Sequence, residues 1–316
     1  MISCTLGIDT SCYTTSAALA GENGFVCQKR LLLPVEPGKR GLRQSEAVFA
    51  HVRQLPKVMR ELMDCDETQN CVIDSVCVSR SPVDDINSYM PVFEAGIAAA
   101  ESVAAAMHVP LYATTHQRGH LRAAQVDSGL NGDSMICLHL SGGTTDVLLK
   151  KGEELTPLLR GLDLHAGQLV DRVGVSLGLP FPAGPHLEKL AREAKETVSL
   201  PVSMEKGGCH LSGAENALFT LIGKGTDPET VAASVYDLLC RTVLRLLKAA
   251  SEDTGENRVL LAGGVASSML LRELLTERNQ KRRMGLEMHF GRPEYSGDNA
   301  VGVALLGREK FRREKK

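Results

Sequence analysis

The sequence contains no tryptophan, and aromatic residues make up only 4% of its 316 positions. Aromatic side chains are the platforms on which the bases of single-stranded nucleic acids stack, so this chain has few of them to offer. Its formal net charge is only -2, which excludes a strong overall basic field for binding nucleic acid. A local basic patch or a partner protein could still supply such a field.

Long apolar runs and the features of a secretory signal are also missing. No apolar stretch approaches the ~20 residues that a membrane-spanning helix needs. The first residues lead directly into a strand pattern, without the basic and apolar regions of a signal peptide. The nine cysteines form no CxxC pair, and an odd number in mostly apolar surroundings predicts reduced thiols. We therefore expect a cytoplasmic protein with no membrane partner.

The chain is long enough to form two domains. With 43% hydrophobic residues it can bury a large core. A polar, glycine-rich stretch at 125–134 is the predicted boundary. We expect an N-terminal lobe at 1–128, a C-terminal lobe at 129–298, and a C-terminal helix at 299–316 that packs back on the first lobe.

A strand, a tight turn and a second strand are predicted between His139 and Lys150. Two glycines in the turn allow backbone N–H groups to face one point, and the flanking hydroxyl groups add donors. Such a turn suits anionic oxygens, most often those of phosphate, although an ordinary glycine hairpin is the alternative. The residues of this turn are Ser141, Gly142, Gly143 and Thr144.

Two other stretches follow a related plan. Near the N-terminus, a strand leads into a polar turn with Asp9 and Ser11, and a second strand follows. At 259–275, an apolar strand reaches Gly263 and Gly264 and then an amphipathic helix begins. The start of that helix offers partial positive charge to a ligand. Together the three stretches predict a duplicated α/β architecture that closes on a nucleotide.

A motif of the form HxxxH provides candidate metal ligands. His116 and His120 project from the same face of a predicted helix, one turn apart. This spacing can chelate one transition metal ion and leave positions for a third ligand and for substrate. The candidate third ligand is Asp298. The alternatives are two surface or capping histidines, and a simple helix N-cap for Asp298.

A predicted helix at 166–177 carries Gly167 and, one turn later, Asp171. The carboxylate of Asp171 is well placed to accept hydrogen bonds from a ribose. A solvated carboxylate on the helix surface is the alternative.

Taken together, these motifs resemble those of one protein family along almost the whole chain. They are GIDTSC, HxxxH, SGGTT, GQLVDR followed by GLPFPAGP, LSGAENAL, AGGVASSMLLR and FGRPEYSGDNAVGVAL. The chain resembles the transferase subunit of tRNA threonylcarbamoyladenosine synthase, a family once named O-sialoglycoprotein endopeptidase. This resemblance implies the actin/sugar-kinase-like ATPase fold, with two lobes around a nucleotide cleft.

The resemblance also implies ligands. It assigns one divalent iron or zinc ion to His116, His120 and Asp298. The phosphates of an ATP- or AMP-type nucleotide would face the SGG turn, and its ribose would face Asp171. The base would lie near Gly184, Gly263 and Gly264, and beside them Ser268 stands where the family has an asparagine. The further substrate-contact candidates are Asp9, Ser11, Thr144 and Gly167.

The implied activity moves a threonylcarbamoyl group from its AMP adduct to N6 of an adenosine in tRNA. The implied partners are tRNA and the protein subunits of the family's assembly. Besides Ser268, four more positions depart from the family. Tyr13 and Thr14 replace an acidic pair, Thr144 replaces a histidine and Gln168 replaces a glutamate. A general base typically contributes roughly 10²–10⁴-fold to a rate, so the catalytic residues stay unassigned.

Other functions are compatible with the same residues. A catalytically impaired relative could serve as a binding or scaffold subunit. A small-molecule kinase of the same fold could use Asp9 or Asp146 as its base, but both histidines would then have no role. A protease is excluded, because Gln117 stands where an HExxH protease has the glutamate that acts as its base.

Overall fold

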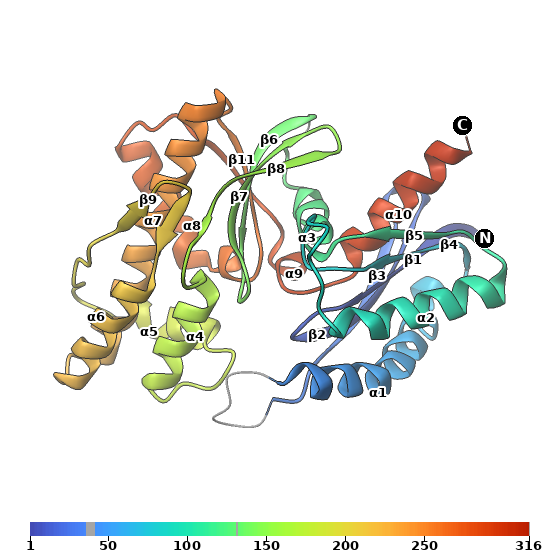
Figure 1. Ribbon diagram of the computed structural model, residues 1–316, viewed down its shortest axis with the longest axis horizontal. Helices are drawn as coiled ribbons and strands as arrows, with labels where there is room; N and C mark the ends of the chain where they lie inside the picture. Colours follow the sequence, from blue (N-terminus) through green and yellow to red (C-terminus); the bar gives the residue numbers. More distant parts are fainter. Residues whose placement is uncertain (36–41, 131, 316) are drawn as a thin grey trace. The chain divides into compact units, whose positions relative to one another are not determined.

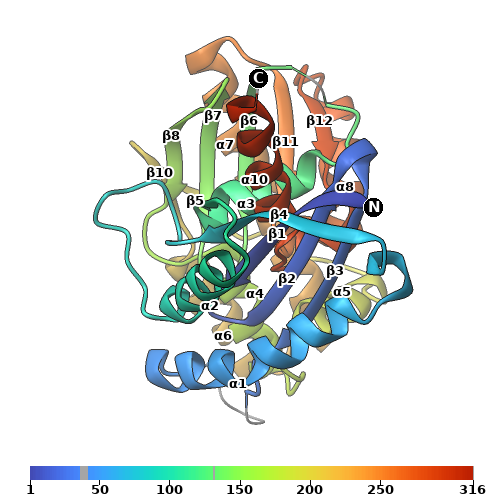
Figure 2. The ribbon, with the colours of Figure 1, turned by 90° about the vertical axis from the view of Figure 1, so that its right-hand side faces the viewer.

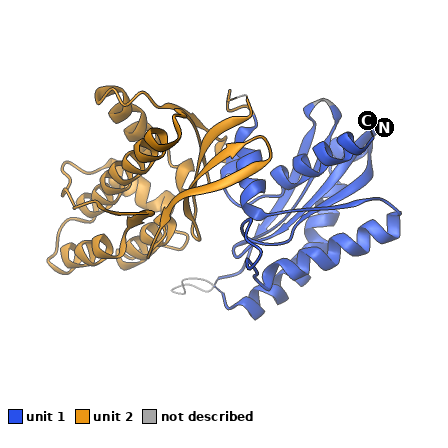
Figure 3. Ribbon diagram, turned by 45° about the horizontal axis from the view of Figure 1, so that its top comes forward, with its two compact units in different colours: residues 1–36, 41–126, 294–316 blue, residues 37–40, 127–293 orange. Residues whose placement is uncertain are grey.

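The computed structural model describes residues 1–35, 42–130 and 132–315. The chain divides into two compact units, which Figure 3 colours blue and orange. Unit 1 is made of residues 1–36, 41–126 and 294–316, and unit 2 of residues 37–40 and 127–293. Among the helices of the described residues, none has both the length and the apolar character that crossing a membrane requires.

Unit 1 is built on a five-stranded sheet with the order β3-β2-β1-β4-β5 (Figure 1). Its strands are β1 (Ile2–Thr10), β2 (Thr14–Gly21), β3 (Val26–Leu32), β4 (Cys71–Ser79) and β5 (Leu111–Thr114). The first three form antiparallel pairs, whereas β4 runs parallel to β1 and β5 parallel to β4. The carboxyl ends of β1 and β4 therefore lie at the same edge of the sheet.

Four long helices cover this sheet. They are α1 (Gln44–Met63), α2 (Val92–Met107), α3 (His116–Gln125) and α10 (Val301–Glu314). Figure 1 shows α1 and α2 on one side of the sheet and α3 and α10 on the other. An apolar core fills each side, with Leu6 and Val58 in the first and Val301 and Ala304 in the second. The larger core lies under α1 and α2.

Helix α10 packs very closely against its neighbours in unit 1. A Cβ atom on Gly302 would come within 1.8 Å of the carbonyl oxygen of Gly119 in α3. One on Gly7 of β1 would come within 2.5 Å of the backbone nitrogen of Ala304. Only glycine allows such approaches, because any larger residue would have to push the backbones apart. This packing fixes the start of α10 beside α3.

Unit 2 is built on a seven-stranded sheet with the order β12-β11-β6-β7-β8-β10-β9. Its strands are β6 (Ser134–Leu140), β7 (Thr145–Lys151), β8 (Glu154–Gly161), β9 (Ser203–Glu205), β10 (Gly208–His210), β11 (Arg258–Ala262) and β12 (Glu287–Phe290). Five of them, in the order β8-β7-β6-β11-β12, reproduce the order and directions of the sheet in unit 1. The predicted duplicated α/β architecture is therefore confirmed.

The helices of unit 2 pack around one buried helix. They are α4 (Ala166–Ser176), α5 (Gly184–Arg192), α6 (Ser212–Gly223), α7 (Pro228–Thr254) and α8 (Met269–Lys281). Helix α7 contacts β6, β7, β8 and β10 as well as the other four helices. Tyr236, Leu239 and Val243 are among its many buried residues. Figure 2 shows the same elements from the side.

The end of the chain differs in one detail from the sequence prediction. The last helix begins at Val301 rather than at residue 299, after the short helix α9 (Pro293–Ser296). The side-chain oxygen of Asn299 accepts a hydrogen bond from the backbone N–H of Val301 at 2.9 Å. A side chain that bonds the first helical N–H in this way belongs to the turn before a helix.

Candidate metal and nucleotide sites

The two histidines of the HxxxH motif lie on α3, one helical turn apart. His116 is the first residue of the helix, and the side chain of Thr115 caps it by accepting a hydrogen bond from the N–H of Arg118. The two imidazole rings meet edge to face, with centroids 4.5 Å apart. Their Nε2 atoms are 3.1 Å apart. The helix therefore presents two imidazole nitrogens to one point.

Asp298 reaches the same point from the segment that joins α9 to α10. Its Oδ1 atom lies 3.2 Å from Nε2 of His120 and 3.6 Å from Nε2 of His116. Its Oδ2 atom accepts a hydrogen bond from the hydroxyl group of Ser11. The N-cap of α10 is Ala300, so the alternative that Asp298 simply caps this helix is wrong.

Asp9, near the carboxyl end of β1, holds His116 from the other side of the ring. Both of its carboxylate oxygens lie 3.0 Å from Nδ1 of His116, and its side chain is fully buried. An ionised carboxylate can only accept, so Nδ1 carries the hydrogen, and Nε2 is the nitrogen whose lone pair a metal would take in place of a proton. The hydroxyl group of Ser79 also donates to Asp9. Asp9 thus fixes the ring orientation and the tautomer that a metal ligand needs.

The charges of this group stabilise one another. Burial by itself raises the pKa of Asp298, but hydrogen bonds from His116 and His120 and the charges of the two rings hold that pKa well below its usual range. Burial likewise lowers the pKa of His116, but Asp9 and Asp298 outweigh it and raise that pKa well above its usual range. The site is therefore built to hold positive charge between two carboxylates.

The donor set suits a divalent transition metal. His116, His120 and Asp298 each offer one donor atom, and the three atoms lie within 4.8 Å of one another. Two imidazole nitrogens and one carboxylate oxygen are ligands for zinc and for ferrous iron, and such a set leaves positions for substrate. The structure thus brings together the three residues that the sequence singled out. That they bind a metal stays a prediction.

A third histidine, His51 of α1, supports the turn that carries Ser11. It is completely buried, and its two ring nitrogens lie 2.7 Å from the hydroxyl oxygen of Thr15 and 2.7 Å from the carbonyl oxygen of Ser11. Burial lowers its pKa, which favours the neutral ring. Sequence analysis missed this residue. Its position one helical turn before Leu55, on the buried face of α1, could have predicted that it is buried.

The second predicted turn gathers hydrogen-bond donors around its serine. The backbone N–H groups of Gly143 and Thr144 donate to the hydroxyl oxygen of Ser141 at 3.3 and 3.2 Å. These bonds are long, and the same two N–H groups can instead hold an anionic oxygen of a ligand. A Cβ atom on the exposed Gly143 would meet no atom within 4 Å. There is therefore space for a ligand beside this residue.

The first turn repeats this pattern around Ser11. Its hydroxyl oxygen accepts from the N–H groups of Tyr13 and Thr14 at 3.4 and 3.3 Å, as that of Ser141 does in the second turn. In both turns the serine N–H donates to the carbonyl oxygen three residues later, at 3.2 Å in the first and 3.0 Å in the second. The duplication therefore extends to the hydrogen bonds of the two turns. Neither Tyr13 nor Thr14 supplies a carboxylate there.

A histidine that sequence analysis missed stands behind the second turn. The hydroxyl oxygen of Thr144 lies 2.7 Å from that of Ser141 and 3.0 Å from Nδ1 of His139, a buried residue of β6. Thr144 occupies the position where the resembling family has a histidine. In this chain an imidazole reaches the turn from the preceding strand instead. A histidine inside an apolar strand was the only sequence signal for it.

Helix α4 begins directly against the second turn. The N–H of Gly167 donates to the carbonyl oxygen of Ser141 at 3.1 Å, and a Cβ atom on Gly167 would lie 2.7 Å from the nitrogen of Gly142. The side-chain oxygen of Gln168 accepts from the N–H of His165 at 3.2 Å, so the residue at the family's glutamate position caps this helix. The positive end of the helix dipole thereby lies beside the turn.

Asp171 binds the backbone of the segment that leads into α5. Its Oδ1 atom accepts a hydrogen bond from the N–H of Ala183 at 2.8 Å. Burial raises the pKa of Asp171, and the bond from Ala183 only partly offsets this. Asp171 is therefore a partly buried, structurally engaged carboxylate rather than a solvated one. Gly184, the first residue of α5, accepts a hydrogen bond from the Tyr236 hydroxyl at 3.2 Å.

The glycine pair after β11 approaches the end of β6. Gly263 has a φ of +97°, and a Cβ atom there would lie 2.2 Å from the carbonyl oxygen of Leu140. Gly264 is exposed, with no atom within 4 Å of a Cβ at its position. Ser268 caps α8 by accepting from the N–H of Leu271 at 3.2 Å. The structure therefore brings Gly263 to the strand that carries the second turn and gives Ser268 a capping role.

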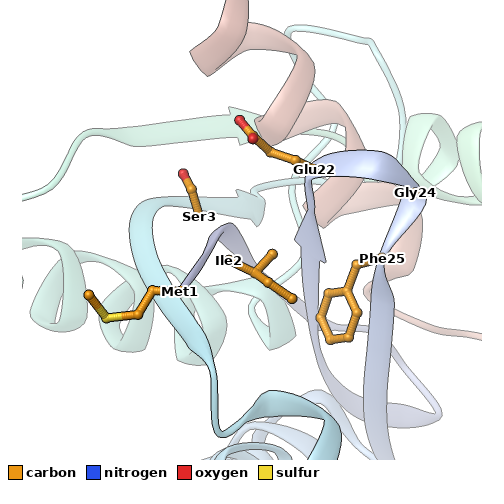
Figure 4. Close-up of a pocket in the computed structure, with 6 residues that line it drawn as sticks. All are labelled: Met1, Ile2, Ser3, Glu22, Gly24 and Phe25. Atoms are coloured by element: carbon orange, nitrogen blue, oxygen red, sulfur yellow. The ribbon is translucent and has the colours of Figure 1, made fainter.

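The start of β1 borders an open hollow of about 480 Å³ (Figure 4). Its lining residues are Met1, Ile2, Ser3, Glu22, Gly24 and Phe25. Asp9 lies near the opposite end of the same strand. No residue that the sequence assigned to a site lines this hollow, so it takes no part in the candidate sites.

Comparison with known sequences identifies relatives. The sequence model of TsaD, tRNA N6-adenosine threonylcarbamoyltransferase, matches residues 36–305. The tRNA N6-adenosine threonylcarbamoyltransferase of Bacillus licheniformis is 30% identical over 318 residues, which cover 97% of this chain and 91% of that protein. A probable bifunctional tRNA threonylcarbamoyladenosine biosynthesis protein of Methanothermobacter thermautotrophicus is 29% identical over 96% of this chain. The chain spans about half of this relative, 55% of its length.

Solved structures share the fold. The HypF protein of T. kodakarensis superposes with a TM-score of 0.66 and 16% identity, over 99% of this chain and 48% of that one. A ROK family glucokinase of Streptomyces griseus, solved with glucose and AMPPNP, gives a TM-score of 0.55 and 13% identity, over 97% of this chain and 99% of that one. With these neighbours, the two-unit α/β architecture is that of the actin/sugar-kinase-like ATPase fold.

Proposed function

The chain belongs to the tRNA N6-adenosine threonylcarbamoyltransferase family, and from this premise we propose that it transfers a threonylcarbamoyl group, or a related carbamoyl group, to an adenosine of tRNA. The donor is an adduct of that group with AMP. In this transfer, N6 of the adenosine attacks the carbamoyl carbon and the bond from that carbon to the phosphate oxygen breaks. AMP leaves, and N6 loses a proton to solvent.

The arrangement of His116, His120 and Asp298 carries this proposal. We expect the Nε2 atoms of both histidines and Oδ1 of Asp298 to hold one divalent iron or zinc ion. When bound, such an ion polarises a carbonyl group as a Lewis acid. Asp9 keeps the proton on Nδ1 of His116, and the Ser11 hydroxyl occupies Oδ2 of Asp298. These two contacts leave the remaining donor atoms facing one point.

The second turn supports binding of an ATP- or AMP-type nucleotide. The backbone N–H groups of Gly143 and Thr144, which both donate to the Ser141 hydroxyl oxygen, can donate to a phosphate oxygen instead. The start of α4, held to the turn by Gly167, adds the positive end of a helix dipole. The other predicted nucleotide contacts are Asp171, Gly184, Gly263, Gly264 and Ser268. In this arrangement AMP departs from the turn once the carbamoyl group has been transferred.

The first turn favours a second candidate function. Thr14 is buried at the start of β2, and neither it nor Tyr13 can act as a carboxylate base. A missing general base costs roughly 10²–10⁴-fold in rate. A catalytically impaired subunit that binds its ligands within an assembly of partner proteins is therefore the alternative. A kinase that uses Asp9 as its catalytic base is disfavoured, because both carboxylate oxygens of Asp9 face His116.

An adenosine-modification assay tests the proposed activity. The full chain, loaded with ferrous iron or zinc, is incubated with tRNA and threonylcarbamoyl-AMP, alone and with candidate partner subunits. Nucleoside mass spectrometry then measures the modified adenosine. We expect product with the unaltered chain and little with the double variant His116→Ala/His120→Ala. If no combination of partners gives product while metal and nucleotide are bound, the scaffold function replaces the transferase.

Metal content tests the site apart from activity. Elemental analysis should find one more iron or zinc ion per molecule in the purified chain than in the double variant His116→Ala/His120→Ala. The exposed His186 provides a matched control, because His186→Ala removes an imidazole outside the site. Equal metal content in the chain and the double variant rules out these ligands.

A further inference from the structure

A second group of metal-binding side chains lies in unit 1, formed by two segments that the proposed mechanism does not use. Cys27 belongs to β3, and Cys65 and Glu67 belong to the connection between α1 and β4. Their sulfur and carboxylate oxygen atoms lie within 4.8 Å of one another. Figure 2 shows this connection passing beside β3. Unlike an isolated thiol, the group offers three donor atoms to one ion.

The fold holds the second segment in place. Helix α1 ends at Met63, and the short 3-10 helix Asp66–Thr68 follows. The buried hydroxyl group of Thr68 donates to the carbonyl oxygens of Leu62 and Cys65, at 2.8 Å in each case. The backbone between the two ligands is therefore fixed by the end of α1. Cys65 and Glu67 are presented from a rigid turn.

The group of Cys27, Cys65 and Glu67 is open enough to solvent for an ion to reach it. Cys27 and Cys65 are half-buried, and Glu67 is exposed. Cys27 packs at the margin of the apolar core under α1 and α2. The two sulfur atoms thus lie in partly dry surroundings, while the carboxylate remains open to water. Zinc sites with three protein ligands keep a fourth position for water in this way.

Lys29 supplies the charge that such a site lacks. It lies two residues after Cys27 on β3, so both side chains point to the same face of the strand. Lys29 therefore places one positive charge on the face of β3 that carries Cys27. Two thiolates and one carboxylate around Zn²⁺ leave a net charge of about -1, which one ammonium group cancels. N–H donors to a metal-bound sulfur are the usual outer partners of such sites.

We propose that Cys27, Cys65 and Glu67 bind a Zn²⁺ ion, with the positive charge of Lys29 balancing the charge of the site. The site ties β3 to the turn after α1 and is separate in sequence from the histidine site. Each cysteine must lose its thiol proton to bind the ion, so binding weakens as pH falls.

A neighbouring pair of thiols does not share this chemistry. Cys4 is completely buried, and burial raises its pKa to about 12. Cys71, the first residue of β4, packs against the same apolar core. No carboxylate is grouped with these two sulfurs among the metal-ligand clusters of the described residues. Cys71 therefore provides a control for the proposed site.

Cobalt binding tests the proposal, because Co²⁺ bound to thiolates gives a charge-transfer absorption that imidazole and carboxylate ligands do not give. The full chain is reduced, stripped of metal with a chelator and titrated with Co²⁺, and then Zn²⁺ is added to displace it. We expect this absorption in the unaltered chain and in His116→Ala/His120→Ala, and its loss in Cys27→Ser/Cys65→Ser. Cys71→Ser should keep it.

Two surface variants test the site without threatening the fold. Glu67→Gln removes an exposed ligand and Lys29→Met removes the outer partner, and each should weaken Zn²⁺ binding roughly tenfold or more. Far-ultraviolet circular dichroism of the metal-free variants checks that each one folds. Absence of the charge-transfer band in the reduced chain overturns the proposal, and so does its survival in Cys27→Ser/Cys65→Ser. A Cys27–Cys65 disulfide in oxidised protein, with no cobalt band after reduction, identifies a redox pair instead.

Discussion

Asp9 and His116 are joined through Nδ1 of the imidazole, which lies 3.0 Å from each carboxylate oxygen. The contact links the end of β1 to the first residue of α3, across 107 positions of sequence. It selects the tautomer with a hydrogen on Nδ1, so that Nε2 faces His120 and Asp298. The histidine pair alone would not be oriented in this way.

Replacing Asp9 with asparagine should weaken metal binding at the histidine site. Asparagine keeps the size of the side chain but removes its charge, so the ring of His116 loses the partner that orients it and raises its basicity. Loss of such an outer partner reduces metal affinity roughly 10–100-fold. Competition with a chelator of known affinity measures the change.

A second carboxylate near the start of α3 is the matched control for Asp9→Asn. Asp84 accepts hydrogen bonds from Thr115 and Arg118. Asp84→Asn should leave metal affinity unchanged, because this carboxylate does not contact either imidazole in any described bond. Equal affinities of Asp9→Asn and the unaltered chain would show that Asp9 has no part in the site.

Two glycines of unit 2 should respond differently to substitution. A Cβ atom at Gly143 meets nothing within 4 Å, so Gly143→Val should fold and should lose adenine-nucleotide affinity, by roughly tenfold or more if the turn binds phosphate. A Cβ atom at Gly167 lies 2.6 Å from the carbonyl oxygen of Ser141, so Gly167→Ala should lower the free energy of unfolding by about 1–3 kcal/mol. Calorimetry and denaturant unfolding measure the two effects. Unchanged nucleotide binding in Gly143→Val removes the turn from the proposal.

Stability should fall in acid, partly through two carboxylates of unit 2. Burial raises the pKa of Asp163, but hydrogen bonds from Ser212, Leu211 and Leu164 outweigh it and lower that pKa to about 2. Bonds from Arg258 lower the pKa of Glu256 to about 2.

Both values lie below those of the unfolded chain, about 4. The stabilisation by Asp163 and Glu256 is therefore complete above about pH 4 and is lost as pH falls toward about 2. A pKa unit corresponds to about 1.4 kcal/mol, but solvent screens these partly exposed groups, so each contributes roughly 1 kcal/mol. Urea unfolding at about pH 6 and about pH 3 should show the loss, and Asp163→Asn should reduce the difference.

Glu252→Gln is the control for this acid effect. Glu252 forms an exposed ion pair with Lys248, and such pairs contribute little to stability. Its replacement should leave the dependence of stability on pH as it is in the unaltered chain. If Asp163→Asn behaves like this control, the hydrogen bonds of Asp163 do not set the acid response.

The contact between α10 and α3 should be the most sensitive packing site of unit 1. Gly302→Ala places a Cβ atom 1.8 Å from the carbonyl oxygen of Gly119, so the two helices must separate. We expect a loss of about 3 kcal/mol or more in the free energy of unfolding. At the end of α6, Gly223→Ala meets no atom within 4 Å and should be neutral or stabilising by up to about 1 kcal/mol. Thermal and denaturant unfolding compare the two variants.

Local patterns predict much of this fold. The apolar strands on either side of Ser11 and Ser141 identify both hairpins, and the spacing of His116 and His120 identifies a helix face. Strand β8 was not predicted, because Pro157 lies inside it and removes a donor from the ladder. The pairing of β7 with β8 shifts register near this residue. The strands β9 and β10 have three residues each, and pairing with neighbours rather than their own sequence defines them.

The candidate sites also depend on contacts that local sequence patterns do not predict. The sequence could suggest Asp298 as a partner of the histidines, but only the close packing of α10 on α3 brings it there. The contact of Asp9 with His116 and the place of His51 behind Ser11 depend on side chains far apart in sequence. Composition and spacing carry no signal for such contacts. The bond from Ala183 to Asp171 is another example, since the sequence alone suggested a ribose contact.

Unit 1 is discontinuous in the chain, whereas unit 2 lies almost wholly within 127–293. During translation the whole of unit 2 therefore emerges before α10 does. Until then the sheet of unit 1 leaves Ala18, Ala20 and Cys77 without the helix that buries them. A nascent chain consequently exposes this surface to chaperones and proteases until α10 has been synthesised. Asp298 also follows unit 2 in the chain, so the histidine site is completed only after residues 127–293 have been synthesised.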